Sequence, residues 1–213
     1  VAAELLGQPA EQLWLEDSYV HAPDGQSVSL ARVATYSLYE HNQFQLIGTA
    51  SHISDQSPPP FSAHFVEIEV DTWTGAIGLL RYVAAVDCGT PINPTLAEGQ
   101  TEGAVLNGIS FALTEQYLFG PNGRLKNASL QSYHIWSMRD KPDIKAILVP
   151  SYEASGPYGA KSVSEIGING AAPAIGNALY NATGVRLFEL PFTRERVWTA
   201  LQSKVREGQG RGD

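Results

Sequence analysis

Hydrophobic and polar residues alternate most regularly over residues 66–71, where Val, Ile and Val are interleaved with three acidic residues. A period of two is typical of a half-buried β-strand. The segment 72–75 has the length and the glycine of a hairpin loop, and residues 76–86 return as a mostly apolar run. Such a run predicts a strand buried on both faces. The pattern therefore predicts an antiparallel hairpin over residues 65–87.

Helix signals follow this hairpin. Asn93 before Pro94 is a favourable N-cap and first-turn pair, which predicts a helix over residues 94–117. Small residues and cap residues predict two further helices, over 170–183 and 194–205. Together with the hairpin, these helices predict an α+β fold in which an antiparallel hairpin sheet packs with helices.

Shorter extended segments complete the C-terminal part. A turn is expected at residues 120–123, strand or extended chain at 130–138, and a strand at 144–149. The last of these leads into a glycine-rich turn before residue 165.

The N-terminal part has weaker signals. A helix stopped by Gly7 is followed by short strands around the turn at 23–25 and by a short helix after Ser29. Residues 48–62 are rich in Ser, Pro and Gln, which indicates a connector. We therefore expect an N-terminal α+β segment with its linker at residues 1–60 and a C-terminal domain at residues 61–213.

One face of the helix predicted over 94–117 lacks bulky side chains. Gly99, Gly103, Asn107 and Ser110 recur at spacings of three and four, with Gln100 at the edge. Such a face lets a ligand approach the helix backbone, and the amide of Gln100 offers hydrogen bonds to it. Close packing of the helix against a sheet would use small residues for the same steric reason, so both interpretations stay open.

The segment 159–167 carries a single carboxylate, Glu165, among small and apolar residues. A carboxylate pressed against a dry pocket becomes a stronger proton acceptor, as a general base requires. Alternatively, Glu165 begins the next helix, where an acidic residue is favourable.

Composition excludes several classes of function. The net charge is −8, and no basic run is long enough to follow a phosphate backbone, so nucleic acid is not expected as a partner. Cys88 is the only cysteine, so neither an internal disulfide nor a Cys-rich metal site is expected, and His134 has no second ligand at metal spacing, which favours an ordinary histidine. No apolar run is long enough to cross a membrane, and we expect a soluble, cytoplasmic protein.

Two motifs, in this order, resemble the C-terminal part of the molybdenum-binding subunit of the xanthine dehydrogenase and aldehyde oxidoreductase family. The first is D-C-G-x-x-I-N-P at 87–94 with G-Q-x-x-G at 99–103, and the second is G-A-K-x-V-x-E at 159–165 with A-P-A-I-x-N-A at 172–178. The strand at 63–70 and the closing Leu-Pro-Phe segment also fit. The resemblance covers nearly the whole chain.

The resemblance implies a molybdopterin-dependent oxidoreductase that hydroxylates an sp² carbon of an N-heterocycle or an aldehyde, with oxygen from water. Glu165 matches the catalytic glutamate, which acts as the base. Gln100 matches a glutamine that contacts the pterin, and Ser162, Val163 and Ser164 match a segment lying against the cofactor. The implied cofactor is molybdopterin with molybdenum, with or without cytosine dinucleotide; the implied partners carry iron–sulfur clusters, with or without FAD.

The resemblance is incomplete in two respects. Ser164 stands where family members commonly have glycine, and a side chain there would narrow the approach to the metal or demand an unfavourable backbone angle. The family loop Gly-Gly-x-Phe-Gly-x-Lys is absent from the sequence, and the triplet Gly-Gln-Gly occurs only at 208–210, after the two motifs rather than ahead of them. We therefore expect a partner chain carrying the N-terminal part of the molybdenum-binding subunit.

Three functional alternatives follow. The xanthine dehydrogenase type is favoured by the overall pattern; the aldehyde oxidoreductase or carbon monoxide dehydrogenase type is the alternative within the family. A third possibility, of another class, is a catalytically inert remnant that acts as an assembly or interaction module.

Overall fold

The computed structural model describes residues 1–41, 43–51, 53 and 55–209. The chain divides into two compact units, Val1–Ile53 and Ser54–Asp213. The division falls within the segment interpreted as a connector. The assignment of residues 1–60 and 61–213 as separate domains stays a prediction.

The N-terminal unit is a small α+β unit. Helix α1 ends at Gly7, whose φ of 62° is left-handed. Ser29 caps α2, because its Oγ accepts a hydrogen bond from the Arg32 N–H at 3.1 Å. The elements in chain order are α1 (Ala2–Leu6), η1 (Ala10–Gln12), β1 (Trp14–Glu16), β2 (Tyr19–His21), β3 (Ser27–Ser29), α2 (Leu30–Thr35) and the π-helix η2 (Tyr36–Glu40), with the three strands forming an antiparallel sheet in the order β1-β2-β3.

The C-terminal unit contains a three-stranded mixed sheet in the order β4-β5-β6. Strands β4 (Phe61–Asp71) and β5 (Ala76–Asp87) pair antiparallel, so the predicted hairpin is confirmed. Strand β6 (Asp143–Leu148) pairs parallel to β5. A parallel strand needs a long crossover connection, and the chain between β5 and β6 supplies it as α3 (Pro94–Leu113) and a loop.

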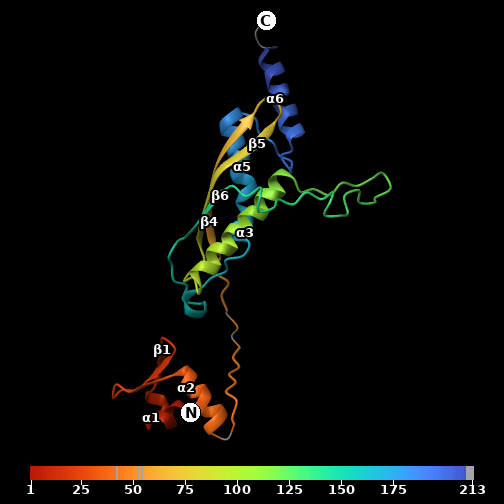
Figure 1. The fold of residues 1–213 in the computed structure, drawn as a ribbon. Helices are drawn as coiled ribbons and strands as arrows, with labels where there is room; N and C mark the ends of the chain where they lie inside the picture. The colour runs from red at the N-terminus through yellow and green to blue at the C-terminus, as the bar shows by residue number, and fades with distance from the viewer. Residues whose placement is uncertain (42, 52, 54, 210–213) are drawn as a thin grey trace. The chain divides into compact units, whose positions relative to one another are not determined.

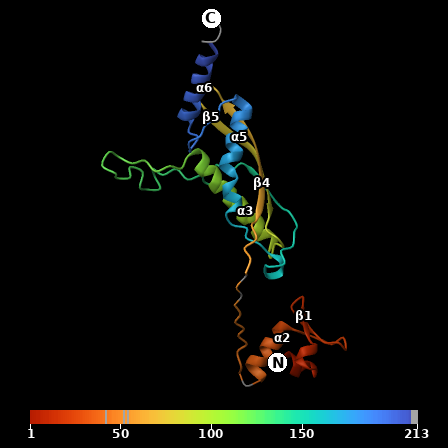
Figure 2. The same cartoon turned by 180° about the vertical axis from the view of Figure 1, so that it is seen from behind.

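Helices cover one face of this sheet (Figures 1 and 2). Helices α3 and α5 (Ala171–Thr183) contribute Val105, Ile109 and Ile175, which are fully buried against Tyr82 of β5. Full burial of a side chain of this size contributes about 1.5–3 kcal/mol, so this layer stabilises the packing of the helices on the sheet. The remaining elements are η3 (Pro157–Gly159), α4 (Ile166–Asn169) and α6 (Arg194–Gln209). The α+β fold class is confirmed.

The prediction that β5 is buried on both faces is wrong. Tyr82, Ala84 and Val86 are buried, whereas the other face of the sheet is open: Phe65 of β4 is 63% exposed and Ile147 of β6 is 39% exposed. The sequence was apolar on both sides of the strand, but the described residues cover only one of them.

Two further predictions need correction. Helix α3 ends at Leu113 rather than at residue 117, because Thr114 leaves the helical region with φ −136°. Of the strand or extended chain expected at 130–138, the strand is not formed, and these residues make turns and irregular chain. Part of the loop between α3 and β6 projects away from the helices and the sheet in both views (Figures 1 and 2), whereas Trp136 in the same loop packs against the core. Within it the turn expected at 120–123 is present, closed by the Gly123 N–H donating to the Gly120 carbonyl at 2.9 Å.

Among the described residues, the helices are all too short or too polar to cross a lipid bilayer.

Candidate active site

The backbone joins the two sequence motifs directly. Gly89 and Ala160 form an antiparallel bridge. The Thr90 N–H donates to the Gly159 carbonyl at 2.8 Å, and the Lys161 N–H donates to the Cys88 carbonyl at 2.7 Å. Segments about seventy residues apart in the sequence are therefore fixed side by side at the end of β5.

A partly buried ion pair reinforces this junction. The ammonium group of Lys161, whose side chain is 7% exposed, lies 2.5 Å from the Asp87 carboxylate. Asp87 also accepts hydrogen bonds from the Ser151 hydroxyl and from the Gly89 N–H at 3.0 Å. The Lys161 hydrogen bond, followed by those of Ser151 and Gly89, lowers the pKa of Asp87 to about 2. The carboxylate is therefore ionised throughout the physiological range.

Gly89 is required at the junction for two reasons. Its φ of 69° is left-handed, and a Cβ there would lie 2.2 Å from the Gly159 carbonyl oxygen. A residue with a side chain is strained at this positive φ, and its Cβ would clash with the Gly159 carbonyl oxygen.

We expect Gly89→Ala to lower the stability of this region by more than about 2 kcal/mol, measured as a lowered midpoint of thermal unfolding. Gly123→Ala is the matched control, since Gly123 has φ 73° but its added Cβ would meet nothing within 4 Å. Equal effects of the two substitutions would show that the backbone angle, and not the contact with Gly159, is the constraint.

A cavity of about 490 Å³ opens beside the junction. Three of the five predicted site residues, Gln100, Val163 and Ser164, line it together with Cys88 and Lys161. The structure thus brings the glutamine of α3 and the second motif to one cavity. Ser162 and Glu165 are exposed and do not line it.

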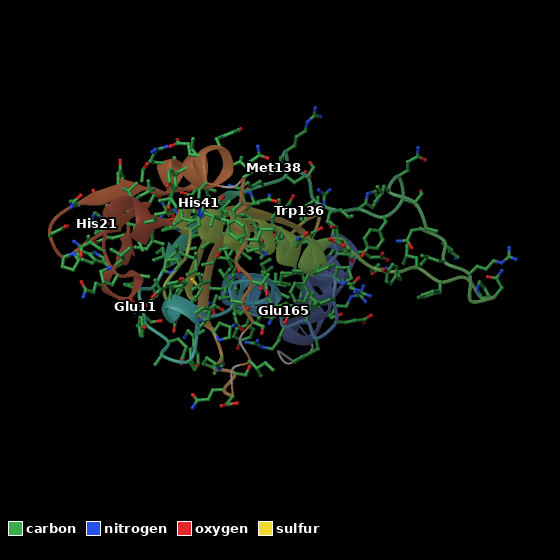
Figure 3. The ribbon with its side chains drawn as sticks, turned by 90° about the horizontal axis from the view of Figure 1, so that it is seen from below. Glu11, His21, His41, Trp136, Met138 and Glu165 are labelled. Atoms are coloured by element: carbon green, nitrogen blue, oxygen red, sulfur yellow. The ribbon has the colours of Figure 1, made fainter. Side chains whose placement is uncertain are left out.

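Glu165 lies at the first turn of α4, where it is the N-cap residue and makes no side-chain capping bond (Figure 3). Its side chain is exposed. The interpretation of Glu165 as a helix start is therefore correct, and the dry pocket expected around it is not formed by the described residues. Enclosure of this carboxylate requires atoms from outside them.

Close packing nevertheless holds α4 against the helix that carries Gln100. A Cβ at Gly167 would lie 2.6 Å from the Ala104 Cβ, and one at Gly108 would lie 2.7 Å from the Ile168 carbonyl oxygen. The glycines that allow tight helix packing are thus Gly108 and Gly167. Gly99 and Gly103 are exposed, and a Cβ at either would meet nothing within 4 Å. The small-residue face is therefore open at Gly99, Gly103 and Asn107, whereas Ser110 is buried and its Oγ accepts a hydrogen bond from the Trp136 N–H at 2.9 Å.

The loop before Glu165 also presents free hydrogen-bonding groups. Within the part of the chain that the structure describes, the backbone N–H groups of Ser162, Val163 and Ser164 donate no hydrogen bond, and the Gln100 amide has no partner. The N–H groups of Val163 and Ser164 and the Gln100 amide, beside the exposed Gly99 and Gly103, suit a heterocycle with oxygen and nitrogen acceptors, such as the pterin of molybdopterin. The residues present therefore fit the cofactor.

Ser164 does not distort this loop. Its φ is not left-handed, so the unfavourable backbone angle considered from the sequence does not occur. Its Oγ lies 3.3 Å from the Ser162 Oγ, within hydrogen-bonding distance. The side chain lines the cavity instead.

Sequence reasoning missed the roles of Asp87 and Lys161. Both stand in the two motifs, and the available signal was one aspartate in the first motif and one lysine in the second, each in a segment poor in charge.

Comparison with known proteins identifies the class. The sequence pattern of the molybdopterin cofactor-binding domain matches residues 1–142. The chain is 40% identical over 201 residues to the probable hypoxanthine oxidase XdhD of Escherichia coli K12, covering 94% of this chain and 21% of that protein. It is 33% identical over 202 residues to the putative xanthine dehydrogenase molybdenum-binding subunit XdhA of the same strain, covering 92% and 27%.

The fold agrees with these sequence matches. The aldehyde oxidoreductase structure from Desulfovibrio gigas superposes with a TM-score of 0.62 at 29% identity, over 67% of this chain and 15% of that one. The chain belongs to the molybdopterin cofactor-binding family, among the molybdenum-binding subunits of the xanthine dehydrogenase and aldehyde oxidoreductase type. This confirms the resemblance carried by the two motifs. The chain spans about a fifth to a quarter of the length of these curated relatives.

Proposed function

We propose that this chain forms one wall of the active site of a molybdenum hydroxylase of the xanthine dehydrogenase type, which hydroxylates an electron-poor sp² carbon of an N-heterocycle or aldehyde with oxygen from water. The observation that carries this proposal is the junction of the two motifs, which puts Gln100, Val163 and Ser164 around one cavity. In this proposal Glu165 is the general base.

Each group of the chain has a distinct task. The Gln100 amide and the N–H groups of residues 162–164 bind and orient molybdopterin. When bound, the cofactor supplies the redox change and makes a water-derived oxygen available as a nucleophile near neutral pH. The Glu165 carboxylate accepts the proton that this oxygen loses, and a positioned base of this kind contributes about 10²–10⁴-fold to the rate.

The rest of the large subunit completes the site. Two surfaces of this chain support that arrangement: the exposed carboxylate of Glu165, which needs further walls to exclude water, and the open sheet face with Phe65 and Ile147. Strand β5 is apolar toward that open face, which favours a covering segment. Electrons leave through iron–sulfur clusters, with or without FAD, on partner domains or subunits.

The direct test uses the chain purified with the rest of its large subunit. Molybdenum is measured by mass spectrometry, and turnover of hypoxanthine, xanthine and aromatic aldehydes is measured in H₂¹⁸O. We expect molybdenum near one per subunit and ¹⁸O in the product. Incorporation of oxygen only from O₂, or a stable metal-free assembly without turnover, would overturn the proposal; the second result would favour the inert assembly module.

A further prediction concerns the open face of α3. Gly103→Ala adds a methyl group to an exposed helix position, where alanine normally stabilises a helix by about 0.5–1 kcal/mol. If the cofactor lies against this face, the added methyl group clashes with it and weakens cofactor binding by about 1–3 kcal/mol. We therefore expect bound molybdenum to fall about tenfold or more in dialysed enzyme.

Glu102→Ala is the control for that experiment. Glu102 neighbours Gly103 on the same helix, and its carboxylate is 3.6 Å from Lys141, a pair that contributes little at a surface. Unchanged molybdenum content in both variants would show that nothing lies against Gly103.

A further inference from the structure

His64 of β4 makes a set of hydrogen bonds that the proposed chemistry does not use. Its Nδ1 lies 2.9 Å from the Tyr82 hydroxyl on the neighbouring strand. Its Nε2 lies 2.9 Å from the Ile166 carbonyl oxygen, in the first turn of α4, and 3.1 Å from the Ser62 Oγ. The imidazole therefore connects the sheet to the residue that directly follows Glu165.

The partners determine the tautomer of the neutral ring. A carbonyl oxygen only accepts, so Nε2 carries the hydrogen and donates to Ile166. Nδ1 is then the acceptor, and the fully buried Tyr82 donates its hydroxyl hydrogen to it. Burial lowers the pKa of His64, although the Ile166 hydrogen bond opposes this shift. The neutral ring with one defined tautomer is consistent with both contacts.

The Ile166 carbonyl is available to His64 because α4 does not use it. In a continuing helix it would accept from the Gly170 N–H, but that N–H donates to the Ile168 carbonyl. The Ile166 carbonyl instead accepts from His64 and from the Ser62 hydroxyl at 3.1 Å. The first turn of α4 is thus held by side chains of β4.

Gly170 completes the arrangement at the junction of α4 and α5. A Cβ there would lie 2.0 Å from His64 Cδ2, so the ring occupies the space that any other residue would fill. The imidazole is fixed by contact on its carbon edge and by hydrogen bonds on both nitrogens. The Ile166 carbonyl that accepts the Nε2–H hydrogen bond belongs to the residue next to Glu165.

We propose that His64 is a positioning residue for Glu165, acting through the Ile166 carbonyl, with Tyr82 fixing the orientation of the imidazole. The inference rests on the proposed role of Glu165 as the base. A shift of about 1 Å in a reacting group can lower a rate about 10²-fold, and a helix of one turn at Ile166–Asn169 has little internal stiffness of its own.

The test compares substitutions that keep or remove the donor. His64→Gln places an amide N–H near the position of Nε2, His64→Asn reaches only the position of Nδ1, and His64→Leu has no donor. In the complete, molybdenum-loaded enzyme we expect Leu and Asn to lower kcat about 10–100-fold at nearly unchanged KM, and Gln to stay within about threefold of wild type. His134→Leu, in the exposed loop after α3, is the control with unchanged kcat.

Two further measurements separate a positioning role from a merely structural one. Hydrogen exchange at the amides of residues 166–170 should accelerate at least tenfold in His64→Leu and not in His64→Gln, whether or not the enzyme turns over. In addition, His64→Leu combined with Glu165→Gln should be no slower than Glu165→Gln alone, because both changes act on one group.

The outcomes are distinguishable from failure of the proposed function. If Glu165→Gln alone retains activity within about tenfold of wild type, the assignment of the base fails, while the exchange data still report whether His64 holds α4. Multiplicative losses in the double variant, or equal kcat values for Leu, Gln and wild type, would overturn the positioning role itself.

Discussion

Glu165→Gln is expected to reduce turnover of the assembled enzyme by at least about a hundredfold while molybdenum content stays near normal. The amide keeps the size of the side chain but does not accept a proton, and loss of a positioned general base lowers a rate about 10²–10⁴-fold. Cofactor retention is preserved because Glu165 does not line the cavity that contains Gln100 and residues 163–164. The measurement is kcat together with metal content of the same preparation.

Glu11→Gln provides the control, since Glu11 is an exposed residue of the N-terminal unit (Figure 3). Activity of the Glu165 variant within about tenfold of wild type would remove this residue from the base role. Loss of activity in proportion to loss of molybdenum would assign Glu165 to cofactor binding instead.

The sequence predicted the local elements of the C-terminal unit because their signals are local. The alternation at 66–71, the loop at Gly75 and the Asn93–Pro94 pair each depend on a few neighbouring residues. What lies against an element was less predictable. Strand β5 is apolar on both sides, which suggested double burial, but the described residues supply a layer for one side only.

The assignment of residues to the site stays a prediction, and their arrangement could not be predicted from the sequence. The two motifs identified Gln100 and Glu165 by resemblance, but no periodicity indicates that Gly89 would pair with Ala160 across about seventy residues. The exposure of Glu165 was likewise not predictable, because a small, apolar sequence neighbourhood does not determine which face of a helix start meets solvent. Long-range pairing and enclosure are tertiary properties.

That long-range junction gives the second large effect. In Lys161→Met the Asp87 carboxylate remains ionised and partly buried with only the Ser151 hydroxyl and the Gly89 N–H as donors. Removing one partner of a fully buried pair is destabilising by about 3–5 kcal/mol, and the effect here is smaller because the Asp87 side chain is 20% exposed. We expect the amides of Thr90 and residue 161, which hold the two motifs together, to exchange hydrogen more than about a hundredfold faster, and bound molybdenum to fall with them.

The same junction predicts a rescue. Lys161→Met combined with Asp87→Leu removes both charges, and an apolar pair of similar volume is often no less stable than the ion pair it replaces; we therefore expect exchange at Thr90 to return to within about tenfold of wild type. Lys126→Met, at an exposed position, is the control for loss of a positive charge.

The pKa of Asp87 is lowered from 3.8 to about 2, so its stabilising contribution is complete above about pH 3.8 and is lost as the pH falls through about 2. The difference in stability between Lys161→Met and wild type should accordingly be constant from pH 5 to 8. A stability difference that disappears within this range would show that the ion pair does not hold the two motifs together. A double variant no more stable than Lys161→Met alone would show the same.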